Sequence, residues 1–229
     1  MPQHFHLSDT DTALPLQEAC LSQLLHSFRP QSSGSILRKL TSRAFGEPSD
    51  TTVLPPIILC IGTDRLIGDS LGPLTGSLLQ RAHCPLPVYG TLAQPVHALN
   101  LTDFLAEIRR THPNSPVIAI DASLGPDSRI GCLTLRPHGL QPGAGVHKRL
   151  APAGDISITG IIGTSGPFSH ITLQTTRLSA VIPVAKQIAL GICMACHCQD
   201  CLSDSVSSSK DPSLLASRAH FLARSCIPL

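Results

Sequence analysis

Two aspartates occupy positions at which carboxylates can act together. Asp69 ends a polar loop that follows an apolar run at residues 57–61, and Asp121 directly follows a second apolar run at residues 117–120. Short runs rich in β-branched residues and framed by Pro or Gly are typical of strands buried on both faces. Parallel neighbouring strands lie about 5 Å apart, and the loops at their carboxyl ends form the ligand-binding edge of an α/β sheet. On adjacent strands, the two carboxylates would reach one water molecule or one metal ion.

Two kinds of chemistry fit this pair. Close carboxylates do not both ionise easily, so one pKa rises; the ionised group then activates water while the protonated group donates to a carbonyl oxygen. Alternatively, Asp69 and Asp121 bind a divalent metal ion, with His97 as a third ligand. The structural alternatives are that Asp69 only caps the helix that begins near residue 70, and that His97 is a surface or capping residue. We prefer the metal-independent chemistry because only oxygen ligands are secure.

The loop between the first strand and the helix carries the other candidate residues. Gly62 and Gly68, with Gly72 beyond them, would let the loop bring backbone N–H groups near a substrate. Asp64 and Arg65 form a local ion pair that shapes the loop, or Arg65 binds a substrate carboxylate. The glycine spacing does not fit a dinucleotide-binding fingerprint, and the chain contains neither a P-loop nor a G-x-S-x-G motif.

Apolar periodicity elsewhere predicts strands that alternate with helices. Strands are expected at residues 88–90, 130–135, 156–162 and 171–173, and helices at residues 14–28, 99–110 and 174–193, the last containing Pro183. This alternation indicates a three-layer α/β fold. We expect an N-terminal helix and connector at residues 1–56, of which the first 13 are loose. An α/β domain follows at residues 57–195, and then a Cys- and Ser-rich tail at residues 196–229.

Composition argues against several classes of protein. The chain has 229 residues, of which 42% are apolar, enough for one domain with a sizeable core. Only 14% are charged and the net charge is +2, which gives no basic field for nucleic acid. No apolar run approaches the roughly 18 to 20 residues of a membrane span. Nine cysteines, an odd count, without a secretory signal favour reduced thiols and a cytosolic location.

The cysteines are concentrated in one segment. Residues 193–201 hold two C-x-x-C pairs and a histidine. Such a cluster binds zinc or a softer metal ion, or it is a cysteine-rich helix end with reduced thiols. Structural zinc sites usually draw their paired ligands from two separated turns, whereas these lie in one stretch, so we favour the helix end.

Several motifs, in the same order along the chain, resemble the YyaC-type sporulation proteins. They are residues 59–65, 68–73, 89–92, 95–98, 118–122, 142–146 and 154–160, and the resemblance covers about residues 57–192. This family is similar to the germination protease and to hydrogenase maturation endopeptidases, which implies a three-layer α/β/α sandwich around a mostly parallel, mixed sheet. By the same resemblance, Asp69 and Asp121 match the two acidic positions of these proteases. No residue here matches the later histidine that completes the nickel site of the hydrogenase endopeptidases.

The resemblance also implies a function. It suggests a peptidase that hydrolyses peptide bonds with Asp69 and Asp121 during sporulation or germination, in the cytoplasm of the mother cell or forespore of a spore-forming bacterium. The alternative is a non-catalytic regulator or assembly factor that retains a protease-like fold. The expected partner is a protein or peptide substrate rather than nucleic acid or a membrane. This interpretation requires no cofactor. If the site holds one, a divalent metal ion is the candidate.

Overall fold

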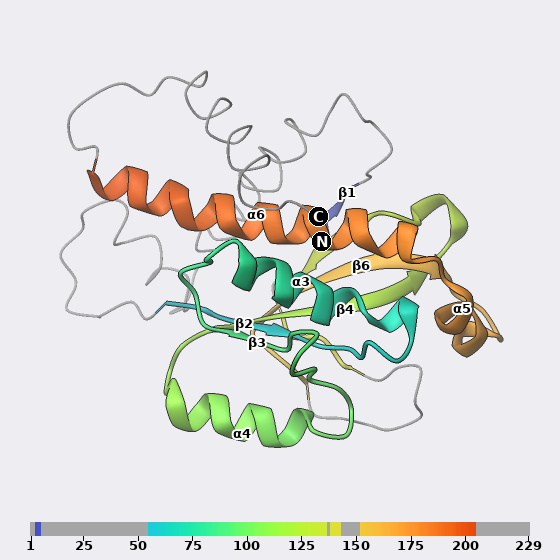
Figure 1. Cartoon of the computed structure of the whole chain (residues 1–229), viewed down its shortest axis with the longest axis horizontal. Coiled ribbons are helices and arrows are strands. Elements are labelled where there is room, and N and C mark those ends of the chain that lie inside the picture. The colour runs from blue at the N-terminus through green and yellow to red at the C-terminus, as the bar shows by residue number, and fades with distance from the viewer. Residues whose placement is uncertain (1–2, 6–54, 137, 143–151, 205–229) are drawn as a thin grey trace.

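The computed structural model describes residues 3–5, 55–136, 138–142 and 152–204. These residues form one sheet with helices packed against it (Figure 1). The helix predicted at residues 14–28, most of the motif at residues 142–146 and the tail beyond residue 204 lie outside the described residues.

Six strands form a single mixed sheet in the order β1-β5-β6-β4-β2-β3. The strands β3, β2, β4 and β6 run parallel, whereas β5 is antiparallel to β6 and β1 is antiparallel to β5. Their bounds are β1 (Gln3–Phe5), β2 (Ile57–Cys60), β3 (Val88–Tyr89), β4 (Val117–Gly125), β5 (Leu133–Arg136) and β6 (Ile156–Thr164). A helix between two strands carries the chain back to start a parallel neighbour. The predicted mostly parallel, mixed sheet is therefore confirmed.

Helices cover both faces of this sheet. The helices α3 (Leu71–Arg81) and α6 (Leu178–Asp204) lie on one face, and α4 (Leu101–Thr111) lies on the other (Figure 1). The strand β2 is apolar along its whole length because both faces are covered. Ile58 and Cys60 join the core under α3 and α6, while Ile57 and Leu59 join the core over α4. The three-layer α/β/α sandwich is confirmed.

The segment after β6 is helical, so the strand predicted at residues 171–173 is wrong. It forms α5 (Ser169–Thr175), which lies beyond the end of the sheet (Figure 1). The hydroxyl of Thr175 donates to the carbonyl of Ile171 at 2.9 Å, and the hydroxyl of Thr176 donates to that of Thr172 at 2.6 Å. These local bonds occupy carbonyls that a strand would pair with a neighbour. The predicted helix at residues 174–193 accordingly begins later, at Leu178.

Residues 3–5 and 121–125 were not predicted as strand but belong to the sheet. Residues 3–5 were predicted to be loose, but they pair with β5 at the edge of the sheet as β1. The strand β4 does not end at residue 120, because β6 continues to pair with it as far as Gly125, with a register shift after Ser123. The apolar pattern stops at residue 120, where polar and small side chains begin. Backbone pairing with β6 extends β4 past residue 120. Such pairing between distant segments does not show in the periodicity of apolar residues.

The helix α6 is unbroken at Pro183 and continues to Asp204. The predicted domain boundary between residues 195 and 196 therefore falls inside a helix, and the division of the chain into three parts remains a prediction. Among the described residues, no single helix is long and apolar enough to cross a membrane. Only α5 and the first part of α6, taken together, reach that length and composition, and they are bent by 89°.

Replacing Gly76 by alanine should destabilise the fold. Alanine normally favours a helix by about 1 kcal/mol over glycine. A Cβ at Gly76, however, would stand 2.1 Å from the carbonyl oxygen of Gly90, a backbone atom that has no room to move. We expect the free energy of unfolding in urea to fall by about 2 kcal/mol. Gly166→Ala is the control, because nothing lies within 4 Å of its Cβ position. A Gly76→Ala protein as stable as the control would contradict this packing.

Candidate active site

The site lies where the parallel strands β2 and β4 end their pairing. Their register joins Cys60 to Ile120, and the N–H of Ile61 donates to the carbonyl of Ile120 at 2.7 Å. Asp121 is the next residue of β4, so it lies beside the start of the loop that leaves β2. Asp121 thus stands inside β4 and not after it as the sequence predicted, but it is at the predicted edge of the sheet.

Asp69 closes the same loop. It is the last residue of a 3-10 turn, η1 (Ile67–Asp69), and directly precedes Ser70, the N-cap residue of α3. The loop folds back on itself because the N–H of Thr63 donates to the carbonyl of Asp69 at 3.0 Å. The hydroxyl of Ser70 donates to the carbonyl of Ile67 at 2.7 Å. The cap position therefore belongs to Ser70, and the interpretation of Asp69 as only a helix cap is not supported.

Glycines bring the loop and the helix close to the strand ends. Gly62 has φ = +141°, and a Cβ there would stand 2.1 Å from the carbonyl oxygen of Asp69. A Cβ at Gly72 would stand 2.0 Å from the carbonyl oxygen of Ile61. The N–H of Gly62 donates to the carbonyl of Val96 at 2.8 Å, so it is not free for a substrate. These glycines allow close packing of the backbone, and the approach of other N–H groups of the loop to a substrate remains a prediction.

Gly68 serves the same purpose on the other side of the loop. A Cβ at Gly68 would stand 2.8 Å from the Cα and the carbonyl oxygen of Leu173 in α5. Only glycine lets η1 touch α5 at this distance. The loop that carries Asp69 is therefore held between the end of the sheet and α5.

Burial shifts the pKa of both carboxyl groups upward, and repulsion from Asp69 adds to the rise at Asp121. Burial raises the pKa of Asp69 from its usual 3.8 to about 6, and a hydrogen bond from the Thr63 backbone opposes this rise in part. Burial raises the pKa of Asp121 well above its usual range, and the negative charge of Asp69 raises it further. The N–H of Ala122 donates to Oδ1 of Asp121 at 2.8 Å and opposes that rise. The two carboxyl groups are thus close enough to interact, as the sequence predicted.

The unequal environments separate the roles of the two groups. With a pKa of about 6, the Asp69 carboxyl is mostly ionised at pH 7, whereas burial and the neighbouring charge of Asp69 favour the protonated form of Asp121. Because the groups interact, the two protonation steps belong to the pair as a whole. A pair in which one carboxyl is ionised and its neighbour is protonated is the arrangement that acid–base catalysis uses.

His97 lies on the neighbouring segment but is held by its own loop. It follows Val96, which forms an isolated parallel bridge with Ile61. The N–H of His97 donates to Oδ1 of Asn100 at 2.7 Å, and Nδ1 of the ring accepts from the N–H of Leu99 at 3.3 Å. These contacts shape the start of α4, as the capping interpretation anticipated.

The described residues do not assemble the metal set predicted from the sequence. Within that part of the chain, no three His, Cys, Asp or Glu side chains come together in a way that could hold a metal ion. His97 therefore does not join Asp69 and Asp121 as a third ligand here. The segment at residues 193–201 is described only in part, since only Cys193 and Cys196 among its side chains are placed, and both are buried. Both lie inside α6, which continues to Asp204, so these two cysteines are not at the exposed helix end that the sequence predicted.

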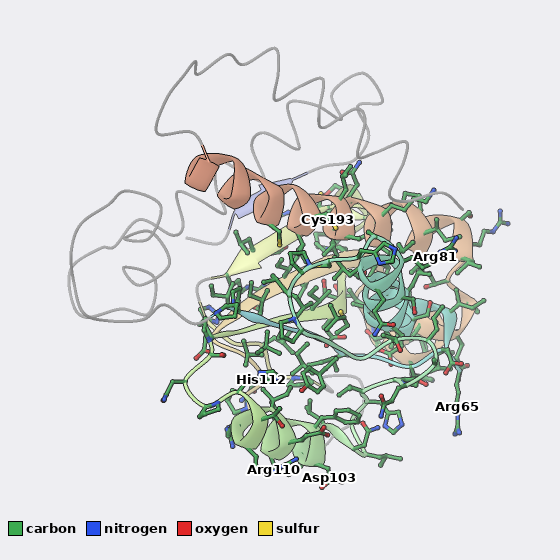
Figure 2. The ribbon with its side chains drawn as sticks, turned by 60° about the vertical axis from the view of Figure 1, so that its left-hand side comes forward. Arg65, Arg81, Asp103, Arg110, His112 and Cys193 are labelled. Carbon is green, nitrogen blue, oxygen red and sulfur yellow. The ribbon has the colours of Figure 1, made fainter. Side chains whose placement is uncertain are left out.

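Asp64 and Arg65 lie outside the carboxyl pair. Both side chains are exposed, and Arg65 extends away from the ribbon (Figure 2). No ion pair joins them in the described structure, so the predicted local salt bridge is absent there. The N–H of Arg65 donates to the hydroxyl of Thr63 at 3.3 Å, which shapes the loop through the backbone instead. Binding of a substrate carboxylate by Arg65 remains a prediction.

Thr159 is a neighbour of the pair that sequence reasoning missed. It lies directly across from Asp121 in the β4–β6 register and is buried. Residues paired in register on neighbouring strands point to the same face of the sheet. The signal in the sequence was Thr159 itself, a polar residue in the middle of the apolar run at residues 156–162. Its position opposite Asp121 depends on the order of the strands, which local patterns do not show.

These features define the class of protein: a three-layer α/β/α sandwich with a carboxyl pair at the point where the parallel strands β2 and β4 end their pairing. The model of the DUF1256 family, described as a protein of unknown function, matches residues 35–191, and the chain belongs to this family. The uncharacterized protein YyaC of Bacillus subtilis (strain 168) is 45% identical over 139 residues, which are 60% of this chain and 68% of YyaC. The resemblance to YyaC-type proteins is therefore confirmed.

One solved structure is also similar. It is described as the NiFe hydrogenase maturation protease HycI from Thermococcus kodakarensis KOD1, and it is 16% identical to this chain. The match covers 62% of this chain and 92% of HycI, with a TM-score of 0.43.

The carboxyl pair should make stability depend on pH in an unusual direction. A folded-state pKa above the usual value means that the folded state binds the proton more tightly, so the free energy of unfolding is highest near pH 4 and falls as the pH rises through about 6. Asn at position 69 removes this loss. The pKa change corresponds to at most about 3 kcal/mol. Because the side chain is partly exposed, we expect Asp69→Asn to be more stable than wild type by about 1 to 2 kcal/mol at pH 7.

The same comparison at pH 4 supplies one control, because the stability difference should vanish there. Asp64→Asn supplies the other, since it makes the same change at an exposed position of the same loop and should alter stability by less than about 0.5 kcal/mol. Urea unfolding at both pH values measures these differences. Loss of stability in Asp69→Asn at pH 7 would show that favourable contacts to the carboxylate outweigh its burial.

Proposed function

We propose that this protein is a peptidase that hydrolyses peptide bonds with Asp69 and Asp121. The observation that carries the proposal is the pair itself: two interacting carboxyl groups whose pKa values are both raised, at the ligand-binding edge of a parallel sheet. Such an environment costs stability, and the fold does not use Asp69 as a helix cap. The motif resemblance to proteases supports the choice of reaction.

Burial of Asp121 beside the charge of Asp69 favours the protonated form of Asp121, and this assigns the roles in the first step. The ionised carboxylate of Asp69 takes a proton from a water molecule as its oxygen attacks the carbonyl carbon of the peptide bond. The protonated carboxyl of Asp121 gives its proton to the carbonyl oxygen as that oxygen gains negative charge. The product is a neutral tetrahedral intermediate, with Asp69 now protonated and Asp121 ionised.

The second step restores both groups. The hydroxyl that was the carbonyl oxygen returns its proton to Asp121 as the C=O bond forms again. The C–N bond breaks, and the leaving nitrogen takes the proton held by Asp69. The products are a carboxylic acid and an amine, and the pair returns to its starting protonation. These steps use only groups that this chain supplies.

The biological setting follows from the family. We propose that the protein acts in sporulation or germination, in the cytoplasm of the mother cell or forespore of a spore-forming bacterium, on a protein or peptide substrate. The resemblance of the motifs to the YyaC-type sporulation proteins supports this setting.

A cleavage assay on proteins from sporulating cells tests the activity. Wild type, Asp69→Asn and the exposed control Asp64→Asn are incubated with the protein mixture, and new termini are read by mass spectrometry. We expect new termini with wild type and Asp64→Asn, and a loss of at least about 100-fold with Asp69→Asn, the range of a missing general base. A parallel arm with EDTA should leave cleavage unchanged. EDTA inhibition would replace the paired-acid mechanism with a metal-dependent one.

The absence of new termini under every condition would contradict the peptidase proposal. It would favour the non-catalytic regulator or assembly factor, in which the pair is only part of a retained fold. Correct folding of each variant is checked by circular dichroism, so that a loss of cleavage is not confused with unfolding.

The pH dependence of cleavage tests the assignment of roles. Since Asp69 must be ionised to accept a proton, kcat/KM should fall about tenfold for each pH unit below about 6. Above that pH the rate should level off for as long as Asp121 holds its proton. A rate that is already maximal at pH 5 would show that Asp69 is not the base.

A further inference from the structure

The exposed apolar side chains are concentrated at one edge of the molecule. In the described part of the chain, six large apolar side chains are at least 41% exposed: Ile67, Leu92, Leu99, Phe168, Ile171 and Leu178. Every one of them lies in a segment that follows the carboxyl end of a parallel strand, namely β2, β3 or β6. Single exposed apolar residues are normal on a protein surface, but here all six lie at the edge of the sheet that holds the carboxyl pair.

The segment after β2 touches each of the other two segments. The N–H of Gly62 donates to the carbonyl of Val96 at 2.8 Å, which joins the β2 loop to the segment after β3. On the other side, the close approach of Gly68 to Leu173 joins η1 to α5. The loop that ends at Asp69 is therefore the middle one of the three. The six residues form a rim with members on both sides of the carboxyl pair, and we call them the apolar rim.

The helix α5 shows that the rim is not a by-product of core packing. None of its residues is buried, yet Ile171 within it is 43% exposed and Phe168 at its N-cap is 67% exposed. Leu173 of α5 packs against the core, but the exposed Ile171 and Phe168 add little to that packing. Their partner is expected outside the fold.

We propose that the apolar rim binds an extended polypeptide segment whose apolar side chains flank the peptide bond to be cleaved. The choice of occupant rests on the proposed function, because the carboxyl pair in the middle of the rim acts on a backbone amide. A rim with members on both sides of the pair fits side chains before and after that amide. The exposed charges in the loop, Asp64 and Arg65, have opposite signs, so selection by the net charge of the segment is not expected.

Peptide binding tests the proposal without requiring cleavage. The probes are two fluorescein-labelled octapeptides of equal net charge, one with Leu, Val, Phe and Leu at its centre and the other with Ser and Thr there. Fluorescence anisotropy is measured on the full chain carrying Asp69→Asn, which should hold a peptide without hydrolysing it. We expect the apolar peptide to bind at least about tenfold more tightly than the polar one.

A variant of the rim then locates the binding. Phe168→Ser with Ile171→Ser, added to the same protein, should weaken binding of the apolar peptide about tenfold. Both side chains are exposed, so the fold should survive. Ala106→Ser, at an exposed position of α4 away from the rim, should leave binding unchanged.

Three results would overturn the proposal: equal binding of the two peptides, binding that the double variant does not weaken, or a dimer in sedimentation that the double variant converts to a monomer. The last would make the rim a contact between two copies of the chain. Rim-dependent binding by a wild-type protein that cleaves nothing would instead uphold the polypeptide site and reject the hydrolysis. Failure of this inference and failure of the proposed function are thus distinguishable.

Discussion

The parallel pairing of β2 with β4 is the constraint on which the rest of the structure depends. It aligns Cys60 with Ile120 and so places Asp121 beside the loop that leaves β2. The loop must then turn within the width of one strand spacing to start α3. Backbone-to-backbone approaches at Gly62 and Gly72 make this turn fit. A side chain at either position would separate the helix from the strand ends, and the carboxyl of Asp69 would move with it. The carboxyl pair is therefore a product of backbone packing more than of side-chain contacts.

The same packing determines the electrostatics. Two carboxyl groups are brought together where burial disfavours charge, and only single backbone hydrogen bonds from Thr63 and Ala122 oppose the rise in their pKa values. The free energy that this arrangement costs must come from elsewhere in the fold. Two separate apolar clusters, one on each face of the sheet, supply it. A sheet covered by helices on one face only would bury less apolar surface and would offset less of this cost. The site therefore depends on helices that cover both faces.

Sequence reasoning predicted the parts of this fold that rest on local patterns. The strand β2, the helix that starts near residue 70 and the neighbouring aspartates all follow from runs of apolar residues and the breakers between them. The errors arose where pairing between distant segments decides the structure. β4 extends through Asp121 because β6 lies alongside it, and Gln3–Phe5 form a strand because β5 offers them an edge. The helix α5 was mistaken for a strand because β-branched residues favour strands only when a partner strand is present. The position of Thr159 opposite Asp121 was also missed, because it depends on the pairing of β4 with β6.

The lengths of the two outermost strands have a consequence for how the molecule behaves among its copies. β3 has two residues and β1 has three, so within the described part of the chain the sheet ends on each side in a strand that offers few unpaired backbone groups. Long, open outer strands recruit other chains through backbone hydrogen bonds and so lead to aggregation. The inner strands β4 and β6, with nine residues each, are the ones that would be hazardous in that position. The sheet has its longest strands at the centre and its shortest at the margins. It is therefore wide enough to carry the site, yet it offers little backbone to which another chain could add a strand.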